Sequence, residues 1–259
     1  MSLTDFPVRL AVRHPLVRRS LTVCAVRDLS PTLRRVTLHG ADLDGFTAAG
    51  PDDHIKVFFP VGDETVARDF TPRMFRVGAP GVAAELDLDF ALHGTDAPAT
   101  GWACRARVGD VLQIGGPRGS HLLPEGIRSA VFVADATALP ATARWLEALP
   151  NEVGVTVLII GTDPALAAYL AEVARPGTTM HLVDVRRHPE ALISRLDEIV
   201  IDEASLVWAA GEAGSLIPLR RHLRKHLGLG RDQAQVSGYW KGGVENLDHH
   251  APLDPTDPD

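Results

Sequence analysis

The chain has 259 residues, of which 45% are hydrophobic and 23% charged, and its formal net charge is −7. This length suits one large domain or two ordinary ones, and the apolar fraction excludes wholesale disorder. No run approaches the ~18 consecutive apolar residues of a membrane-spanning helix. The net acidity argues against a nucleic-acid-binding protein, which would need a basic domain.

The cysteine content and the N-terminus indicate a compartment. Cys24 and Cys104 are the only cysteines, too few for a disulfide framework. Asp5, Pro7 and Arg9 stand where a secretory signal would need an apolar run. We therefore expect a cytoplasmic protein.

Residues 15–124 are predicted to form an antiparallel β-barrel domain. Leu86, Leu88 and Phe90 alternate with Asp87 and Asp89, a period of two that is typical of half-buried strands. Gly- and Pro-containing turns separate the short β-like segments, which favours a compact barrel. These segments are 21–29, 34–40, 54–60, 84–94 and 110–116.

Residues 125–243 are predicted to form an α/β domain with a parallel sheet. Apolar strand segments at 129–135, 153–161, 180–185, 204–211 and 233–240 alternate with helical segments at 138–150, 163–174, 188–199 and from Ser215 onward. Ligands of such sheets bind beyond the carboxyl ends of the strands. Those ends are Asp135, Gly161, Asp184, Gly211–Glu212 and Tyr239–Trp240.

The last predicted helix is amphipathic. Its apolar stripe leaves the basic side chains facing water; the stripe is Leu216, Leu219, Leu223 and Leu227, and the basic residues are Arg220, Arg221, Arg224 and Lys225. Residues 244–259 follow with five acids, three prolines and no Lys or Arg. We predict that they form an acidic, mobile tail.

Residues 68–73 read Arg-Asp-Phe-Thr-Pro-Arg at the end of a predicted strand. Arg73 has the planar, permanently charged donor that binds a pyrophosphate bidentately. The Thr71 hydroxyl suits the polar edge of a flavin ring, and Phe70 suits packing against that ring. The alternative is an edge strand with ordinary surface arginines.

A second segment, residues 87–103, carries further candidates. His93 and Gly94 end a strand, and the glycine permits close approach of the backbone to a ligand. Thr100 suits a helix cap or a phosphate donor, and Trp102 a stacking surface. The alternatives are a structural role for His93 and a place in the core for Trp102.

Together these segments resemble a known family. Arg68-x-Phe-Thr-x-Arg73 resembles the flavin signature of the ferredoxin reductase-like superfamily, and LDFALHGTDAPATGWA resembles the longer signature of siderophore-interacting proteins, the flavin-dependent ferric-siderophore reductases. The resemblance covers about residues 20–243 in order. The family pattern favours Gly before Pro98 and an acid after Asp135, whereas this chain has Ala97 and Ala136. These departures put the loop beside the pyrophosphate and any role of side chain 136 in doubt.

The resemblance implies FAD on the barrel. Arg68, Phe70, Thr71 and Arg73 would hold the flavin and pyrophosphate; His93, Gly94, Thr100 and Trp102 would line the phosphate and adenine side; Asp135, Thr137 and Ala138 would face the flavin; and Tyr239 and Trp240 would approach its ring. No catalytic acid–base residue is expected, because the flavin carries the chemistry. The resemblance implies no metal site in the protein itself. His222 and His226 stand four residues apart on a predicted helix, but Leu223 replaces the Glu that an H-E-x-x-H zinc motif needs after the first His.

The implied activity is an FAD-dependent ferric-siderophore reductase that acts as a monomer. The α/β half lacks a G-x-G-x-x-G fingerprint, so a transiently docked NAD(P)H or a ferredoxin stays open as the electron donor. Two alternatives remain. One is an NAD(P)H:flavin or ferredoxin-type reductase with another acceptor, and the other is a siderophore-binding module without turnover.

A bulky, often anionic ferric complex predicts a locally basic entrance. Only three of the 26 basic residues are lysines, and two of these adjoin segments assigned to the flavin. The substrate-binding candidates are therefore Lys56 and Lys241, with Arg118 third. The alternative for each is solvated surface charge.

Overall fold

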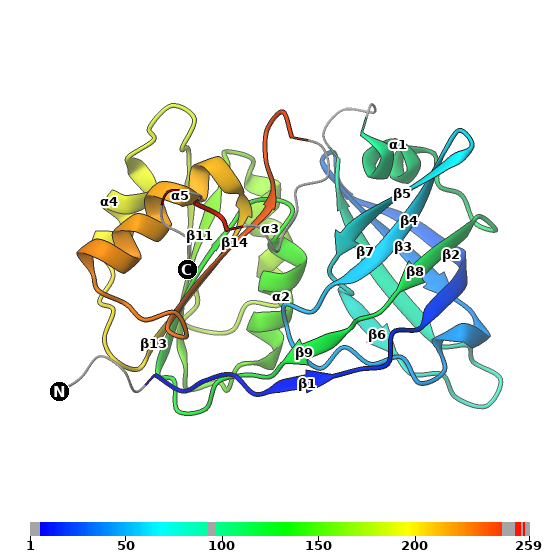
Figure 1. Ribbon diagram of the computed structural model, residues 1–259, viewed down its shortest axis with the longest axis horizontal. Helices are drawn as coiled ribbons and strands as arrows, with labels where there is room; N and C mark the ends of the chain where they lie inside the picture. The colour runs from blue at the N-terminus through cyan, green and yellow to red at the C-terminus, as the bar shows by residue number, and fades with distance from the viewer. Residues whose placement is uncertain (1–5, 93–96, 245–251, 255, 257–259) are drawn as a thin grey trace. The chain divides into compact units, whose positions relative to one another are not determined.

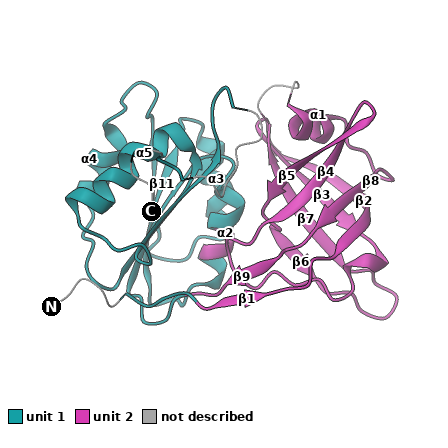
Figure 2. Cartoon of the chain, in the orientation of Figure 1, with its two compact units in different colours: residues 1–9, 124–142, 146–259 teal, residues 10–123, 143–145 magenta. Residues whose placement is uncertain are grey.

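The computed structural model describes residues 6–92, 97–244, 252–254 and 256. The chain divides into two compact units (Figure 2). One comprises Leu10–Leu123 with Ala143–Trp145, and the other comprises Met1–Arg9, Pro124–Thr142 and Leu146–Asp259. We call them the β unit and the α/β unit.

The β unit is built on a curled antiparallel sheet (Figure 1). Its seven strands lie in the order β5 (Glu64–Phe70), β4 (Ile55–Val61), β8 (Val111–Gly115), β2 (Arg18–Ser30), β3 (Leu33–His39), β7 (Glu85–Ala91) and β6 (Met74–Arg76). The strands β1 (Ala11–Arg13) and β9 (Gly119–His121) form a separate antiparallel pair. A 3₁₀ turn (Ala41–Leu43) and α1 (Pro98–Arg105) complete the unit. The predicted antiparallel fold is confirmed as an open half-barrel, with β5 and β6 at its edges.

Alternation along the strands builds the core of this unit. On β7, Leu86, Leu88 and Phe90 are at most 1% exposed, and they pack with apolar residues of β2, β3, β4 and β8. Because successive side chains of a strand point to opposite faces, the three acids of β7 lie on the other face. That face carries polar contacts that bear on the candidate site.

The α/β unit contains the predicted parallel sheet, which is confirmed. Its strand order is β12 (Thr179–Val183), β11 (Gly154–Ile160), β10 (Ser129–Ala134), β13 (Ser205–Glu212) and β14 (Ala234–Trp240), and all neighbours are parallel. The helices are α2 (Leu139–Ala148), α3 (Pro164–Ala171), α4 (Ala191–Asp197) and α5 (Ala213–Arg221), followed by a π-helical turn (His222–His226). Buried leucines of α4 and α5 share one core cluster with Val131 and Val133 of β10. Within the described ranges, no helix is long and apolar enough to cross a bilayer.

The structure differs from the expected mobile tail at the residues it describes there. Leu253 packs against the core cluster that contains the α5 leucines, and Asp254 is 2% exposed. Arg221 Nε donates to Asp254 Oδ2 at 2.6 Å, and Arg221 Nη2 donates to Thr256 Oγ1 at 2.9 Å. Arg220, predicted to face water, is also buried, at 5% exposure. The described residues of this segment therefore contact the rest of the α/β unit through one apolar side chain, one paired carboxylate and the Thr256 hydroxyl.

Candidate functional site

The Arg-Asp-Phe-Thr-Pro-Arg segment spans the end of β5 and the turn into β6. Thr71 and Arg73 are 7% and 5% exposed, so neither is an ordinary surface residue. Arg68 lies on β5, where its Nη1 donates to the carbonyl oxygen of Ala67 at 2.9 Å. Arg68, Thr71 and Arg73 thus lie within six consecutive residues, on the segment that leads from the edge strand β5 to the opposite edge strand β6.

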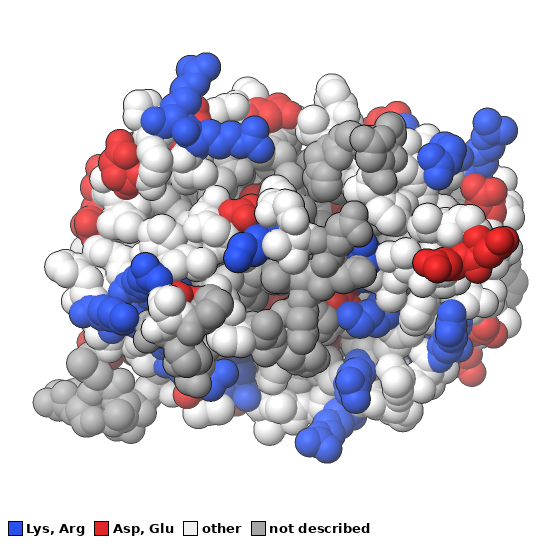
Figure 3. Space-filling model, turned by 45° about the horizontal axis from the view of Figure 1, so that its top comes forward, with Lys and Arg blue, Asp and Glu red and all other residues white. Residues whose placement is uncertain are grey.

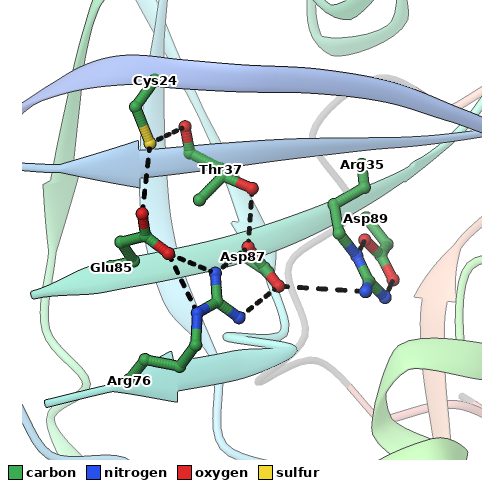
Figure 4. Close-up of polar contacts among 7 residues, drawn as sticks. All are labelled: Cys24, Arg35, Thr37, Arg76, Glu85, Asp87 and Asp89. Carbon is green, nitrogen blue, oxygen red and sulfur yellow. Dashed lines mark hydrogen bonds and ion pairs between the residues drawn. The ribbon is translucent and has the colours of Figure 1, made fainter.

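Asp87 anchors the turn that carries Arg73. The backbone N–H of Arg73 donates to the Asp87 carbonyl oxygen at 2.9 Å. The Asp87 carboxylate accepts two hydrogen bonds from Arg76, at 2.7 and 2.8 Å, and one from Thr37 Oγ1 at 2.8 Å (Figure 4). Burial would raise the pKa of Asp87, but the hydrogen bonds from Arg76 and Thr37 outweigh it and hold the pKa below its ordinary value. Asp87 therefore stays ionised and fixes β6 against β7.

The same network continues along β7 (Figure 4). Asp89 accepts from Arg35 Nε and Nη2, both at 2.7 Å, and Glu85 Oε2 accepts from Arg76 Nε at 3.0 Å. The Cys24 thiol donates to the Thr37 carbonyl oxygen at 3.4 Å, and burial raises its pKa. The sequence analysis did not assign these residues to the site. The sequence does contain a signal for these contacts, because Glu85, Asp87 and Asp89 alternate along one face of β7. Carboxylates that become buried need cationic partners on neighbouring strands.

An aromatic cluster in the core of the β unit brings together side chains of β4, β5, β7 and α1. Phe70 packs against Phe90, with ring centroids 4.6 Å apart, and against Phe59 at 5.8 Å. Trp102 of α1 packs against Phe59 and Phe90 at 5.7 and 5.8 Å. Trp102 is 9% exposed, whereas Phe70 is only partly buried. Of the two rings, Phe70 has more surface left for a ligand.

Thr100, His93 and Gly94 were the remaining candidates of this unit. Thr100 lies inside α1 and not at its cap, is 3% exposed, and its hydroxyl points to the Ala91 carbonyl oxygen at 3.5 Å. His93 and Gly94 lie outside the described residues. The candidate residues of β5 and the turn after it are two arginines, a buried threonine and a partly buried phenylalanine ring. That set suits a ligand combining phosphate groups with a planar ring, as FAD does.

At the carboxyl end of the parallel sheet, Asp135 is the central acceptor. Its Oδ1 accepts from the backbone N–H and the hydroxyl of Thr137, at 2.8 and 2.6 Å. Its Oδ2 accepts from the backbone N–H of Glu212 at 2.9 Å and from Trp240 Nε1 at 2.8 Å. Asp135 is 8% exposed and the neighbouring Ala138 is fully buried. The structure thus brings together Asp135, Thr137 and Trp240.

Glu212, which the sequence analysis placed at a strand end without a role, caps α5. Its carboxylate accepts from the backbone N–H groups of Ser215 at 2.6 Å and Gly242 at 3.2 Å. Burial opposes ionisation, but hydrogen bonds from the backbone N–H groups of Ser215, Gly242 and Gly214 outweigh it and lower the pKa of Glu212. The N-terminus of α5 is therefore occupied by the chain's own carboxylate.

The substrate candidates lie at the surface. Lys56 Nζ pairs with Asp69 Oδ2 at 2.7 Å, and its side chain is 45% exposed. Arg118 is exposed, and Lys241 begins a turn that the Val244 N–H closes on the Lys241 carbonyl oxygen at 3.1 Å. Tyr239 is 38% exposed. On the face drawn in Figure 3, the Lys and Arg side chains stand in separate groups and not in one continuous patch.

The histidine pair on the last helix has structural contacts. His222 Nε2 lies 2.8 Å from Asp197 Oδ1, and its ring stacks on that of His226 with centroids 4.8 Å apart. In the described part of the chain, no three His, Cys, Asp or Glu residues group as metal ligands would.

Comparison with known proteins places the chain in a family. The model "Siderophore-interacting FAD-binding domain" matches residues 22–67 and 60–121, and "Siderophore-interacting protein" matches 127–243. The chain is 30% identical over 252 residues to the NADPH-dependent ferric-chelate reductase of Escherichia coli, covering 88% of this chain and 95% of that protein. It is 29% identical over 254 residues to the ferric vibriobactin reductase ViuB of Vibrio cholerae, covering 90% and 92%.

A solved structure agrees with these matches. The siderophore utilization protein from T. fusca superposes with a TM-score of 0.81 at 34% identity, covering 94% of this chain and 100% of that one. The two family models together cover both units of the fold. The chain therefore belongs to the siderophore-interacting protein family.

Proposed function

We propose that the protein is an FAD-dependent ferric-siderophore reductase. The observation that carries the proposal is the end of β5, where buried Thr71 and Arg73 follow Arg68 within a unit that matches an FAD-binding domain. The names of the relatives, which are reductases of ferric chelates and ferric vibriobactin, support the same reaction. When bound, FAD accepts electrons in pairs and passes them on singly, which suits the reduction of Fe³⁺.

In this proposal the residues of the chain bind and orient FAD and the ferric complex. Arg68 and Arg73 bind the pyrophosphate, the Thr71 hydroxyl donates to the polar edge of the ring, and Phe70 packs against it. Trp240 and Tyr239 are assigned to the ring, and Lys56, Lys241 and Arg118 attract an anionic ferric complex. Siderophores bind Fe²⁺ far less well than Fe³⁺, so reduction releases the iron.

NAD(P)H or a ferredoxin is the proposed electron donor, and the protein is proposed to work as a cytoplasmic monomer. The turn from β10 to α2 lacks the Gly-rich fingerprint with which a dinucleotide-binding domain offers backbone N–H groups to phosphate at its first strand-to-helix turn. This difference supports transient docking of the donor over tight binding. Free Cys24 and Cys104 suit a reducing compartment.

The test is an absorption spectrum followed by turnover. Purified protein that is mixed with FAD and then separated from unbound FAD should retain flavin absorbance. With NADPH, NADH or reduced ferredoxin, it should form Fe²⁺ from ferric siderophores, trapped by a ferrous chelator. Faster reduction of quinones or free flavin would favour the general reductase, and siderophore binding without Fe²⁺ would favour the binding module. Absence of flavin after reconstitution would refute the proposal.

A further inference from the structure

Trp240 is held through its indole N–H by a residue two strands away. The sheet order places β13 between β10 and β14, yet the carboxylate of Asp135, which follows β10, accepts from Trp240 Nε1 at 2.8 Å. Trp240 pairs with Glu212 after an irregularity in register beside Gly211. The hydrogen bond therefore joins the ends of β10 and β14 across the strand β13 that lies between them.

Gly211 makes this reach possible. A Cβ at position 211 would lie 2.7 Å from Asp135 Cγ and Oδ2, and the residue has φ +149°. Real Cβ atoms essentially never approach heavy atoms so closely, so a side chain here would displace the carboxylate. The small residue on β13 thus leaves the space through which Asp135 crosses to β14.

Among the residues that the structure describes, those that donate hydrogen bonds to the Asp135 carboxylate belong to its own unit. Each carboxylate oxygen accepts two hydrogen bonds. Oδ1 accepts both from Thr137, and Oδ2 accepts one from Glu212 and one from Trp240. A carboxylate with two oxygens and about four lone-pair sites is then well satisfied. The Asp135 carboxylate therefore has little acceptor capacity left for a ligand. This argues that Asp135 does not act by contacting the ligand itself.

Glu212 restrains the other end of the same segment. Its Oε1 accepts from the Gly242 backbone N–H at 3.2 Å, and the Val244 N–H closes a turn onto the Lys241 carbonyl oxygen. Lys241 therefore stands between Trp240, held by Asp135, and Gly242, held by Glu212.

We propose that Asp135 is a positioning residue that fixes the Trp240 side chain, while Glu212 fixes the turn after it, so that Trp240 and Lys241 are presented in one conformation. Where it gives Trp240 a role in turnover, this inference rests on the proposed function. The hydrogen-bond geometry that it describes does not. The experiment below therefore has one arm that needs neither FAD nor substrate.

The first arm follows the four tryptophan indole N–H groups by ¹⁵N NMR in the protein without added FAD. The Trp240 signal is assigned by its loss in Trp240→Phe. Asp135→Asn replaces the carboxylate with a neutral amide that has only one acceptor oxygen. The Trp240 N–H then faces either the amide N–H₂ group or a weaker, neutral acceptor. Its signal should therefore shift, and its exchange with solvent should become about tenfold faster. The other three signals should stay in place.

Asp163→Asn is the matched control. Asp163 also follows a parallel strand and accepts a backbone N–H, from Ala165 at 2.9 Å, at the start of α3. It should leave the Trp240 signal unchanged. An unmoved Trp240 signal in Asp135→Asn, or an equal shift in Asp163→Asn, would overturn the inference. Far-UV circular dichroism checks that each variant is folded.

The second arm is a double-mutant cycle on ferric-siderophore reduction. If Asp135 acts through Trp240, Asp135→Asn and Trp240→Phe should each lower kcat/KM by about tenfold, and the double variant should fall no further. Multiplied effects in the double variant would overturn the positioning role in turnover. A wild-type protein that forms no Fe²⁺ would instead refute the proposed function, and the NMR arm would still decide the positioning of Trp240.

Discussion

At Asp87 a single buried carboxylate binds side chains from two neighbouring strands, Thr37 of β3 and Arg76 of β6. Its own backbone carbonyl holds the N–H of Arg73. Asp87 thus links the stability of the half-barrel to the placement of a cofactor-binding candidate.

Replacing Asp87 with Ala should lower the free energy of unfolding by about 1.5–3 kcal/mol, because Thr37 and Arg76 lose hydrogen bonds to a charged acceptor, while Arg76 is 39% exposed and keeps Glu85 as a partner. Urea denaturation at neutral pH measures this change. Asp28→Ala is the control, since Asp28 pairs with Arg34 at 2.6 Å but is 62% exposed. It should cost at most about 1 kcal/mol.

The difference in the free energy of unfolding between wild type and Asp87→Ala should depend on pH. The pKa of Asp87 is lowered in the folded protein, so its contribution is fully present above the unfolded pKa of about 3.9. It is lost as the pH falls through the lowered folded pKa. The stability gap between wild type and Asp87→Ala should therefore narrow below about pH 4. A gap independent of pH would contradict this account of the pair.

Arg73→Ala should weaken FAD binding about tenfold to a hundredfold, because charge-assisted hydrogen bonds contribute roughly 1.5–3 kcal/mol. Arg73→Lys should also be impaired, since a point charge does not replace the planar guanidinium. Quenching of flavin fluorescence on titration measures the Kd. Arg128→Ala, a 64% exposed arginine of the other unit, should bind FAD as the wild type does. Unchanged affinity in Arg73→Ala would mean that the cofactor binds elsewhere.

At the scale of elements, Gly211 at the end of β13 leaves the space in which Asp135, after β10, contacts Trp240 of β14. The glycine has a left-handed φ and no room for a Cβ beside Asp135. Such positions tolerate little substitution, because backbone strain and the steric conflict act together.

Gly211→Ala should destabilise the α/β unit by about 1–3 kcal/mol from backbone strain and should also disturb the Asp135–Trp240 hydrogen bond. Urea denaturation and the Trp240 indole N–H signal report the two effects. Gly154→Ala is the matched control on β11, where a Cβ would meet only the Arg128 carbonyl oxygen at 3.9 Å. Equal stability of the two variants would contradict the steric argument.

The C-terminal segment is a second element that adds to stability. Truncation after Gly243 removes Leu253 from the core cluster and Asp254 from Arg221. Hydrogen bonds from Arg221 and Thr256 hold the pKa of Asp254 far below its ordinary value. We expect the truncated chain to fold but to unfold at a lower urea concentration. A chain ending at Thr256 keeps both contacts and should match the wild type.

At the scale of the whole molecule, a net charge of −7 opposes the approach of an anionic ferric complex. Local basic residues must offset this field. Lys56→Glu/Lys241→Glu should therefore raise KM for a triply negative catecholate complex and leave kcat nearly intact, as expected for lost uniform binding. Steady-state Fe²⁺ trapping measures both constants.

Salt, substrate charge and the third lysine supply the controls. High salt should mimic the double variant, because the Debye length falls from ~10 Å at 0.1 M to ~3 Å at 1 M. A neutral hydroxamate complex should respond weakly to both. Lys225→Glu changes the same charge in the π-helical turn after α5 and should have a smaller effect. Equal effects on charged and neutral complexes would contradict an electrostatic entrance.

The sequence by itself determined the class of the fold and where to look for the site. Alternation at Leu86, Leu88 and Phe90 places them in a core whatever the neighbouring strands are, because the pleat has a period of two. Apolar strands that alternate with helices likewise require a parallel sheet covered by helices. The order of residue types from Arg68 to Arg73 is local, and it can be read directly from the chain.

Only the tertiary structure decided which polar groups meet. Asp87 and Asp89 read as the solvent side of a half-buried strand, yet both are buried, because β3 and β6 bring Arg35 and Arg76 to them. Asp135 contacts Trp240, 105 residues away, across Gly211. Such pairs depend on strand order, register and the space left by a third residue. No local pattern encodes these, because hydrogen bonds form between atoms that folding brings within about 3 Å of each other.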